Sequence, residues 1–573
     1  MLRVRRLYSE PKTFDTIDFV DGINLVFGET TEGNDKTNGV GKSLSIEFLN
    51  YGLLKQHKDS RISRIPSIFF PTDVLICLDF LINSHSVTTK RSIKNNTSPE
   101  LIVDGISTKF TSLKEANRAL AKLLFESNDS INSPSFRSIL GPLIRDERSE
   151  FKSIIKCFDT DKRIPSDYTP HLYFLNIDPV PYQEALRLNK EIKRIKAASK
   201  KIKENVFAVT GKDLLDAKAE LNELTRQVKE IENELQRLEN IKGYEIVKDE
   251  IIEIETKLEQ ARSQQAVLKS EISKINLFSG EKVYIDDQEV AELYNQFKDG
   301  LGDAISKELQ EVIKFKQKID DFQKTMMRNR YESINSKLQK VTKQISSLNK
   351  KYKNKISILD QDGLLKSLKQ TIASYQRKSE ERAELATLIN KYSEYEREIK
   401  EKEKERKDNI YLLDSYLTNS KDIVNSLENT ILDIHEFVAG NSSCSFEAKV
   451  KDNVEIVNLK LHIYDDGSHS NEREKVFLYD IALLLNSVIA DRHPGLLIHD
   501  NIFDVDKDTL IKSLNYLHNN IETISQKQYI LTINSDEFTS DDMDNLALNL
   551  EAFKRASFTK QERFLKVNYQ ENK

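Results

Sequence analysis

The chain has 573 residues, of which 31% are charged and 38% hydrophobic, and its formal net charge is −5. This length exceeds what one hydrophobic core supports, so we expect several structural units. The slightly acidic balance excludes a basic field over the whole surface, so any nucleic-acid site must be a local patch.

The three cysteines, Cys77, Cys157 and Cys444, are far apart and show no C-x-x-C spacing. This pattern argues against structural zinc and disulfides and favours a reducing compartment. No apolar run approaches the ~20 residues that span a bilayer, and the N-terminus lacks the apolar core of a secretory signal. We therefore expect a cytoplasmic protein without membrane contact.

Residues 1–180 have the short apolar and alternating runs of a mixed α/β segment. We predict strands over residues 13–20, 23–27, 74–81 and 86–91, with turn residues between them.

The strand predicted at 23–27 leads into a glycine-rich loop and a helix over 44–49. Backbone N–H groups of such a loop bind phosphate, a lysine adds charge at the β- and γ-phosphates, and a serine hydroxyl can bind Mg²⁺. The loop is longer than the strict motif, because Lys36 stands where a glycine is expected and the glycine that ends the strand is Gly28. The residues predicted to bind ATP are Asn38, Gly39, Gly41, Lys42 and Ser43, with Ser43 also a Mg²⁺ ligand.

The middle of the chain predicts a long helical coil. Apolar residues recur at three- and four-residue spacing with charged flanks, as in the stripes that start at Leu221, Leu258 and Ile334. We predict an ascending arm over 181–276, an apex over 277–303 and a returning arm over 304–436, with interruptions near 240–243 and 360–363. Separate helices in a bundle are the alternative.

A basic cluster lies at the start of the ascending arm, where a patch that tracks nucleic-acid phosphates is expected. A solvated helix face is the alternative, since charge runs on coils are commonly exposed. The residues of this DNA-contact hypothesis are Lys190, Lys193, Arg194, Lys196, Lys200 and Lys201.

Residues 437–573 again read as α/β, with strands predicted over 444–450, 457–463, 496–498 and 529–533. A polar loop with Ser468 and Ser470 precedes an apolar helix over 476–485. A serine and a helix N-terminus in such a loop could contact the phosphate of a nucleotide bound by a second copy of the chain. An ordinary helix-capping loop is the alternative.

The strand at 496–498 ends in Asp500, which suits a carboxylate held beside Mg²⁺. Asn501 follows where ABC ATPases carry a glutamate that activates water, and an amide cannot act as a general base. The strand at 529–533 ends in Asn534, where these enzymes place a histidine, and Asp504 is either a catalytic residue or a helix cap. These departures predict slow hydrolysis. His499 is a conceivable substitute base, although a hydrogen-bonded strand-end histidine is the simpler interpretation.

The whole chain resembles the SMC/RecN-like ABC ATPases, and within them an uncharacterised bacterial coiled-coil family found in multi-component, Lamassu-like anti-phage defence systems. The segments that carry the resemblance are Asn38–Ser43, Ser135–Arg137, Leu143–Arg145, Ile498–Asp500 and Leu531–Asn534. The resemblance implies an α/β ABC-type head assembled from both chain ends, with a long antiparallel coiled-coil insertion. Arg137 and Arg145 would serve the nucleotide loop or DNA, with salt bridging as the equal alternative.

The resemblance further implies that two ATP-engaged heads dimerise and that DNA lies against heads and coils. We expect ATP and Mg²⁺ as cofactors, double-stranded DNA and a second copy of the chain as partners, and cleavage by a separate nuclease or effector subunit. The predicted function is a slow, DNA-sensing ATPase of a defence or DNA-repair complex. The alternative is a structural adaptor that uses ATP to lock a dimer with little hydrolysis.

Overall fold

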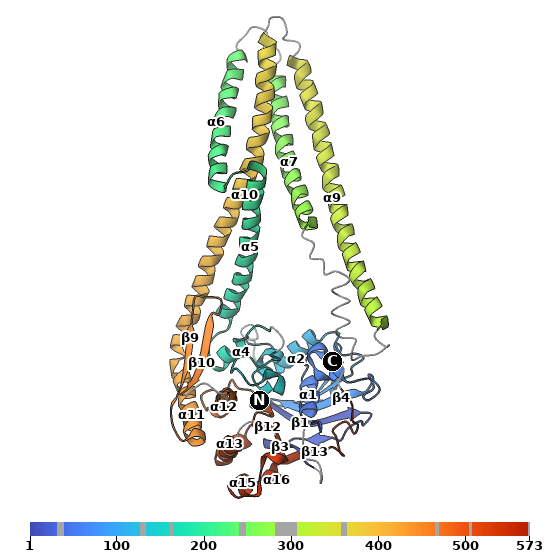
Figure 1. Ribbon diagram of the computed structural model, residues 1–573, viewed down its shortest axis with the longest axis vertical. Coiled ribbons are helices and arrows are strands. Elements are labelled where there is room, and N and C mark those ends of the chain that lie inside the picture. The colour runs from blue at the N-terminus through green and yellow to red at the C-terminus, as the bar shows by residue number, and fades with distance from the viewer. Residues whose placement is uncertain are drawn as a thin grey trace. The chain divides into compact units, whose positions relative to one another are not determined.

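The computed structural model describes residues 1–30, 39–125, 133–160, 164–239, 248–280, 306–356, 364–464, 469–503 and 507–570. Two compact units divide the chain: the head, made of Met1–Asn189 with Glu405–Lys573, and the helical unit, Lys190–Lys404. In Figure 1 the blue N-terminal segment and the red C-terminal segment are interleaved in the head, which contains both labelled chain ends.

A five-stranded parallel sheet forms the centre of the head, in the order β13-β3-β12-β11-β8. Its three middle strands are buried at every position, as expected for apolar strands covered on both faces. The strands are β3 (Gly22–Gly28), β8 (Ile144–Arg145), β11 (Leu496–Asp500), β12 (Gln528–Asn534) and β13 (Lys554–Phe558).

A second, antiparallel sheet has the order β2-β1-β4-β5-β6-β7. Its strands are β1 (Leu2–Glu10), β2 (Ile17–Asp18), β4 (Leu75–Ile82), β5 (His85–Arg91), β6 (Glu100–Val103) and β7 (Ile106–Lys109). The strand predicted over 13–20 was wrong in extent, since only Ile17 and Asp18 pair with β1. Phe14, Ile17 and Phe19 are nevertheless buried, so apolar residues of this run enter the core although most of the run pairs with no strand.

The two chain ends are tied together by direct contacts across the head. The Gln528 side chain accepts a hydrogen bond from Val4 N (2.7 Å) and donates one to Val4 O (2.8 Å). Backbone bonds join Leu2 to Pro494 (2.6 Å) and Phe564 to Val40 (3.2 Å). The predicted α/β head assembled from both chain ends is thus confirmed.

Helices surround these sheets, and a two-stranded hairpin of β9 (Cys444–Val450) and β10 (Val457–Ile463) completes the head. The helices are α1 (Lys42–Gly52), α2 (Leu113–Phe125), α3 (Phe136–Leu140), α4 (Thr169–Phe174), α11 (Lys421–Ala439), α12 (His469–Leu485), α13 (Lys507–Asn519), α14 (Ile521–Ser525), α15 (Ser540–Asp544) and α16 (Leu550–Phe553).

The helical unit is an antiparallel coil in which α7 pairs with α9 and α10 pairs with α5 and α6. The helices are α5 (Val180–Thr210), α6 (Leu214–Glu239), α7 (Lys248–Gly280), α9 (Ser306–Ile356) and α10 (Leu364–Asn419). The first residues of α5 and the last residues of α10 are counted with the head. Tyr352 donates to Glu255 (2.7 Å) and Gln265 to Thr342 (2.8 Å), so residue numbers rise along one helix as they fall along the other.

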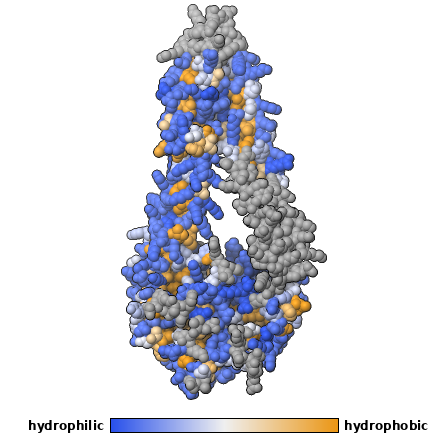
Figure 2. Space-filling view, in the orientation of Figure 1, coloured by the Kyte–Doolittle hydropathy of each residue, from blue (hydrophilic) through white to orange (hydrophobic). Residues whose placement is uncertain are grey.

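The heptad stripes pack as predicted. Leu258, Ala261, Ile345 and Leu348 form one buried seam between α7 and α9. A second seam joins α5, α6 and α10 through Ile202, Val206, Ala217, Leu385, Leu388 and Ile389. Figure 2 shows that hydrophilic residues cover most of the viewed face of this unit.

The predicted interruptions at 240–243 and 360–363, and most of the apex at 277–303, lie outside the described residues. Among the helices that the structure describes, none has the length and apolar character that a membrane crossing requires.

Candidate functional site

The described part of the phosphate loop closes tightly onto α1. Gly39 and Gly41 have φ values of 81° and 110°, a region that favours glycine. A Cβ on Gly41 would lie 2.6 Å from Cβ of Phe564, so the position excludes any side chain. Helix α1 then begins at Lys42, which places its first N–H groups and Ser43 beside the loop.

Lys42 is buried, with 5% of its surface exposed. Its Nζ donates to Oδ1 of Asn501 (3.0 Å), a neutral acceptor, and within the described ranges it forms no ion pair. A buried ammonium group whose hydrogen-bond partner is neutral is costly and suits an anionic ligand.

Asp500 ends β11 and is 1% exposed. Thr532 donates its hydroxyl to Oδ1 of Asp500 (2.7 Å) and accepts from the backbone N–H of Asn501 (2.9 Å). Burial, followed by the nearby Glu147 carboxylate, raises the pKa of Asp500 to about 7. A cation in contact with this carboxylate would stabilise its charged form.

Asn534 ends the neighbouring strand β12 and is 5% exposed. Its Nδ2 donates to Glu537 (2.7 Å) and lies 3.5 Å from Oδ1 of Asn501. Its Oδ1 is buried and has no hydrogen-bond partner in the part of the chain that the structure describes. A Cβ on Gly28 would lie 3.2 Å from this oxygen and 3.4 Å from Cδ of Lys42, so the end of β3 closes the group.

Glu147 also belongs to this group, and the sequence did not single it out. It lies in a short helical turn, Glu147–Ser149, directly after β8, and its Oε1 accepts a hydrogen bond from Nδ2 of Asn501 (3.1 Å). The Asp146-Glu147 pair after a short apolar run could have indicated it. The sequence does not show, however, which strand lies beside that run in the sheet.

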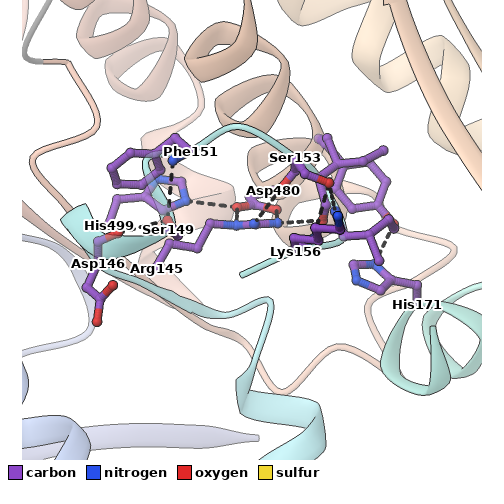
Figure 3. A network of polar contacts seen from close by, with 12 residues as sticks. Arg145, Asp146, Ser149, Phe151, Ser153, Lys156, His171, Asp480 and His499 are labelled. Atoms are coloured by element: carbon purple, nitrogen blue, oxygen red, sulfur yellow. Dashed lines mark hydrogen bonds and ion pairs between the residues drawn. The ribbon is translucent and has the colours of Figure 1, made fainter. Parts of the chain in front are cut away.

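A buried polar network anchors the turn that carries Glu147. Figure 3 shows Asp480 of α12 between Arg145 of β8 and His499 of β11. Arg145 Nη2 donates to Asp480 Oδ1 (2.9 Å), and His499 Nε2 lies 3.1 Å from Asp480 Oδ2. Burial penalises the charge of Asp480, but Arg145 and His499 hold the pKa of this carboxyl below its usual value.

This network bears on two sequence-based expectations. Arg145 is 0% exposed and pairs with Asp480, so of the alternatives given for it DNA contact was wrong, and the salt bridge is formed but is buried instead of superficial. His499 contacts Asp480 and Tyr529 (3.1 Å), so the interpretation of a hydrogen-bonded strand-end histidine is confirmed. Arg137 binds Asn50 Oδ1 and Leu53 O at the end of α1, both at 2.9 Å.

Several predicted site residues lie outside the described residues: Asn38, Ser468 and Asp504, together with the side chain of Ser470. Helix α12 begins at His469, and Arg473 in its second turn donates to the carbonyl of Asn501 (3.1 Å). Arg473 was not among the predicted site residues, yet it connects the α12 end to the loop after Asp500.

The basic cluster on α5 belongs to the helical unit, and all six of its cations are exposed. Lys196 pairs with Glu403 (2.7 Å) and Lys200 lies 3.9 Å from Glu204. Lys190, Lys193 and Arg194 form no ion pair within the described ranges.

The donor set fits a nucleotide with Mg²⁺. Lys42, whose hydrogen-bond partner is neutral, and the unpartnered Oδ1 of Asn534 both lack a ligand that a phosphate and its water would supply. Ser43 and Asp500 are the oxygen ligands that Mg²⁺ prefers, and Mg²⁺ would neutralise phosphate charge there. Within the described residues there is no cluster of three or more histidine, cysteine or acidic side chains that could hold a metal ion.

A phosphate loop and an acidic strand end are supplied by the two ends of the chain, so the fold is an α/β head with a long antiparallel coiled-coil insertion. The family described as "AAA domain" matches residues 6–259, and one described as "Uncharacterised protein conserved in bacteria (DUF2326)" matches residues 424–569. The chain is 23% identical over 563 residues to the uncharacterized protein YydD of Bacillus subtilis (strain 168), covering 92% of this chain and 91% of the relative.

Two solved structures are similar over most of their length, each at 12% identity and a TM-score of 0.32. One is the Smc head domain with a coiled coil and joint from Pyrococcus yayanosii, with 96% of this chain and 94% of that chain covered. The other is the Smc head domain with an extended coiled coil bound to the C-terminal domain of ScpA from Pyrococcus furiosus, with 95% and 92% covered.

Proposed function

We propose that the chain is an SMC-like ATPase that binds ATP and Mg²⁺, hydrolyses ATP slowly, dimerises through its heads and binds DNA. The observation that carries the proposal is Lys42: a buried cation at the N-terminus of α1, with only a neutral partner, beside Asp500 and the unpartnered oxygen of Asn534. Phosphate oxygens satisfy this arrangement.

Titration of the purified full chain with a fluorescent ATP analogue and Mg²⁺ tests nucleotide binding. We expect Lys42→Ala to weaken binding ~10- to 100-fold, the range for losing a hydrogen bond to a charged group. Lys12→Ala is the matched control, because Lys12 is 69% exposed and pairs with the surface residue Asp15 (3.2 Å). Equal affinity of the wild-type and Lys42→Ala chains, both folded by circular dichroism, contradicts the proposal.

Slow turnover is supported by Asn501 and Asn534, because neither amide side chain accepts a proton at neutral pH. The alternative function, an adaptor that uses ATP to lock a dimer, rests on the same two residues. Steady-state phosphate release with and without double-stranded DNA separates them. An ATPase releases phosphate continuously, whereas the adaptor binds nucleotide and releases almost none.

DNA binding is supported by Lys190, Lys193 and Arg194, which are exposed cations on one stretch of α5. Replacing all three with Gln should weaken binding of a DNA duplex and lower the salt dependence of binding, since phosphate contacts release counter-ions. Lys337, Lys340 and Lys343 on α9 are also exposed and offer a control with the same change in charge. An equal effect of both triple substitutions would show that α5 holds no specific patch.

Head dimerisation is proposed on the resemblance stated above, which implies that two copies engage around ATP. Light scattering with and without ATP measures it. We place the protein in a cytoplasmic complex for anti-phage defence or DNA repair, with a nuclease or effector subunit as partner, on the resemblance stated above and on its free thiols. Co-purification with the products of neighbouring genes tests this assignment.

A further inference from the structure

The hydrolysis proposed above lacks a proton acceptor at its expected place. Attack of water on the γ-phosphorus forms one O–P bond and breaks the bond to the β-phosphate oxygen, which leaves with ADP and its electron pair. The proton of the water must go to a nearby base, and a carboxylate is suited to it. Residue 501, which follows the Mg²⁺-associated Asp500, is an amide and cannot accept it.

The sheet places a carboxylate one hydrogen bond away from residue 501. Strands β8 and β11 run parallel with Ile144 beside Ile498 and Arg145 beside His499. Continuing this register brings the second residue after β8, Glu147, beside Asn501, and the contact Nδ2 to Oε1 of 3.1 Å agrees with it. Glu147 is exposed, so its carboxylate is open to water and to a ligand.

The side chain of Asn501 is oriented by its partners. Its Oδ1 accepts from Lys42 (3.0 Å), so its Nδ2 faces Glu147. Asn501 also has a φ of 62°, in the left-handed region that asparagine tolerates better than most residues. The amide therefore links the phosphate-binding lysine to Glu147 through two hydrogen bonds.

We propose that Glu147 is the general base of ATP hydrolysis in this protein. It follows the neighbouring strand β8 and accepts the proton that the amide of Asn501 cannot accept. Its carboxylate accepts the proton of the attacking water and returns it to solvent. Glu537 and Asp146 are further carboxylates near the group. Glu537 contacts Asn534 (2.7 Å) and thus lies one further hydrogen bond from residue 501. Asp146 pairs with Lys55 (3.4 Å) and accepts from the backbone N–H of Arg148 (3.1 Å). The inference depends on the proposed ATPase function.

The test compares full-length variants by phosphate release and by titration with a fluorescent ATP analogue. Glu147→Gln should bind the analogue with near wild-type affinity and release phosphate about 100-fold more slowly. Glu150→Gln is the matched control, because Glu150 is an exposed glutamate near the end of the same turn that pairs with Lys152, and it should leave both values unchanged.

An exchange variant tests the carboxylate itself. Glu147→Gln combined with Asn501→Asp keeps an amide-to-carboxylate hydrogen bond and moves the carboxylate to residue 501, so we expect phosphate release about tenfold or more above the single Glu147→Gln variant. A double variant no faster than Glu147→Gln, a Glu147→Gln chain as fast as wild type, or a loss confined to Glu537→Gln overturns the assignment. Failure of the wild-type chain to bind the analogue refutes the proposed function instead. Binding without any hydrolysis refutes only the assignment of Glu147 as the general base.

Discussion

Replacing Asp480 with asparagine should destabilise the head more than any surface change. The substitution keeps the shape of the side chain but removes the carboxylate that the buried Arg145 contacts. In the part of the chain that the structure describes, its other acceptors are the carbonyls of Ser153 (3.0 Å) and Ile154 (2.7 Å). Arg145 and Asp480 are 0% and 1% exposed, so solvent does not screen the uncompensated charge. Breaking such a pair costs about 3–5 kcal/mol.

At about 2 °C per kcal/mol for a large domain, this loss corresponds to a Tm lower by about 6–10 °C. Far-ultraviolet circular dichroism on heating is the assay, because the chain has no tryptophan to follow. The control is Asp508→Asn, which removes an exposed pair with Lys512 (2.8 Å) and should change stability by about 0.5 kcal/mol or less. A Tm of Asp480→Asn equal to that of the control would refute the view that this ion pair holds the head together.

Three further outcomes are expected. Gly41→Ala should abolish binding of the fluorescent ATP analogue, whereas Gly105→Ala, which has a similar φ of +84° but open space around it, should not. Burial lowers the pKa of His171 and of His493 to about 3, so only the unfolded chain gains these protons as the pH falls below about 6.5. Each histidine should therefore lower the free energy of unfolding by about 1.4 kcal/mol at pH 5.5 relative to pH 7.5, measured by urea unfolding. Equal stability at the two pH values would contradict this. Leu258→Ala should destabilise the seam between α7 and α9 by about 2–5 kcal/mol and increase proteolysis within the helical unit, and an unchanged digestion pattern would argue against the seam.

The strands that hold the site could be predicted almost to their ends. Residues 23–27, 496–498 and 529–533 are short apolar runs, and the structure extends them to Gly22–Gly28, Leu496–Asp500 and Gln528–Asn534. Strands covered on both faces leave this unbroken signal in the sequence. The run at 13–20 misled because burial of alternate side chains does not require a partner strand, and only two of its residues pair.

The coil was predicted in its seams but not in how its helices pair. Apolar spacing identifies the face of a helix that is buried, as at Leu258 and Ile345, but not which of several helices covers that face. The polar cross-contacts carry that information: Arg262 of α7 lies 3.6 Å from Glu380 of α10 in addition to its place beside α9. Such contacts involve charged residues that look like any other solvated position in the sequence.

Some residues of the site could likewise be predicted from local sequence patterns, and others could not. Lys42 and Asp500 stand in recognisable local patterns, and the structure brings the residue after Asp500 to within 3.0 Å of the lysine. Glu147 stands in no such pattern, because its place follows from the pairing of a two-residue strand, β8, with β11. Arg145 belongs to this pairing: its guanidinium binds α12 through Asp480 while its backbone pairs with His499. One buried arginine thus contacts both α12 and the strand that precedes Glu147. On the proposed role of Glu147 as the base, a change at Asp480 should slow ATP hydrolysis by more than it weakens nucleotide binding.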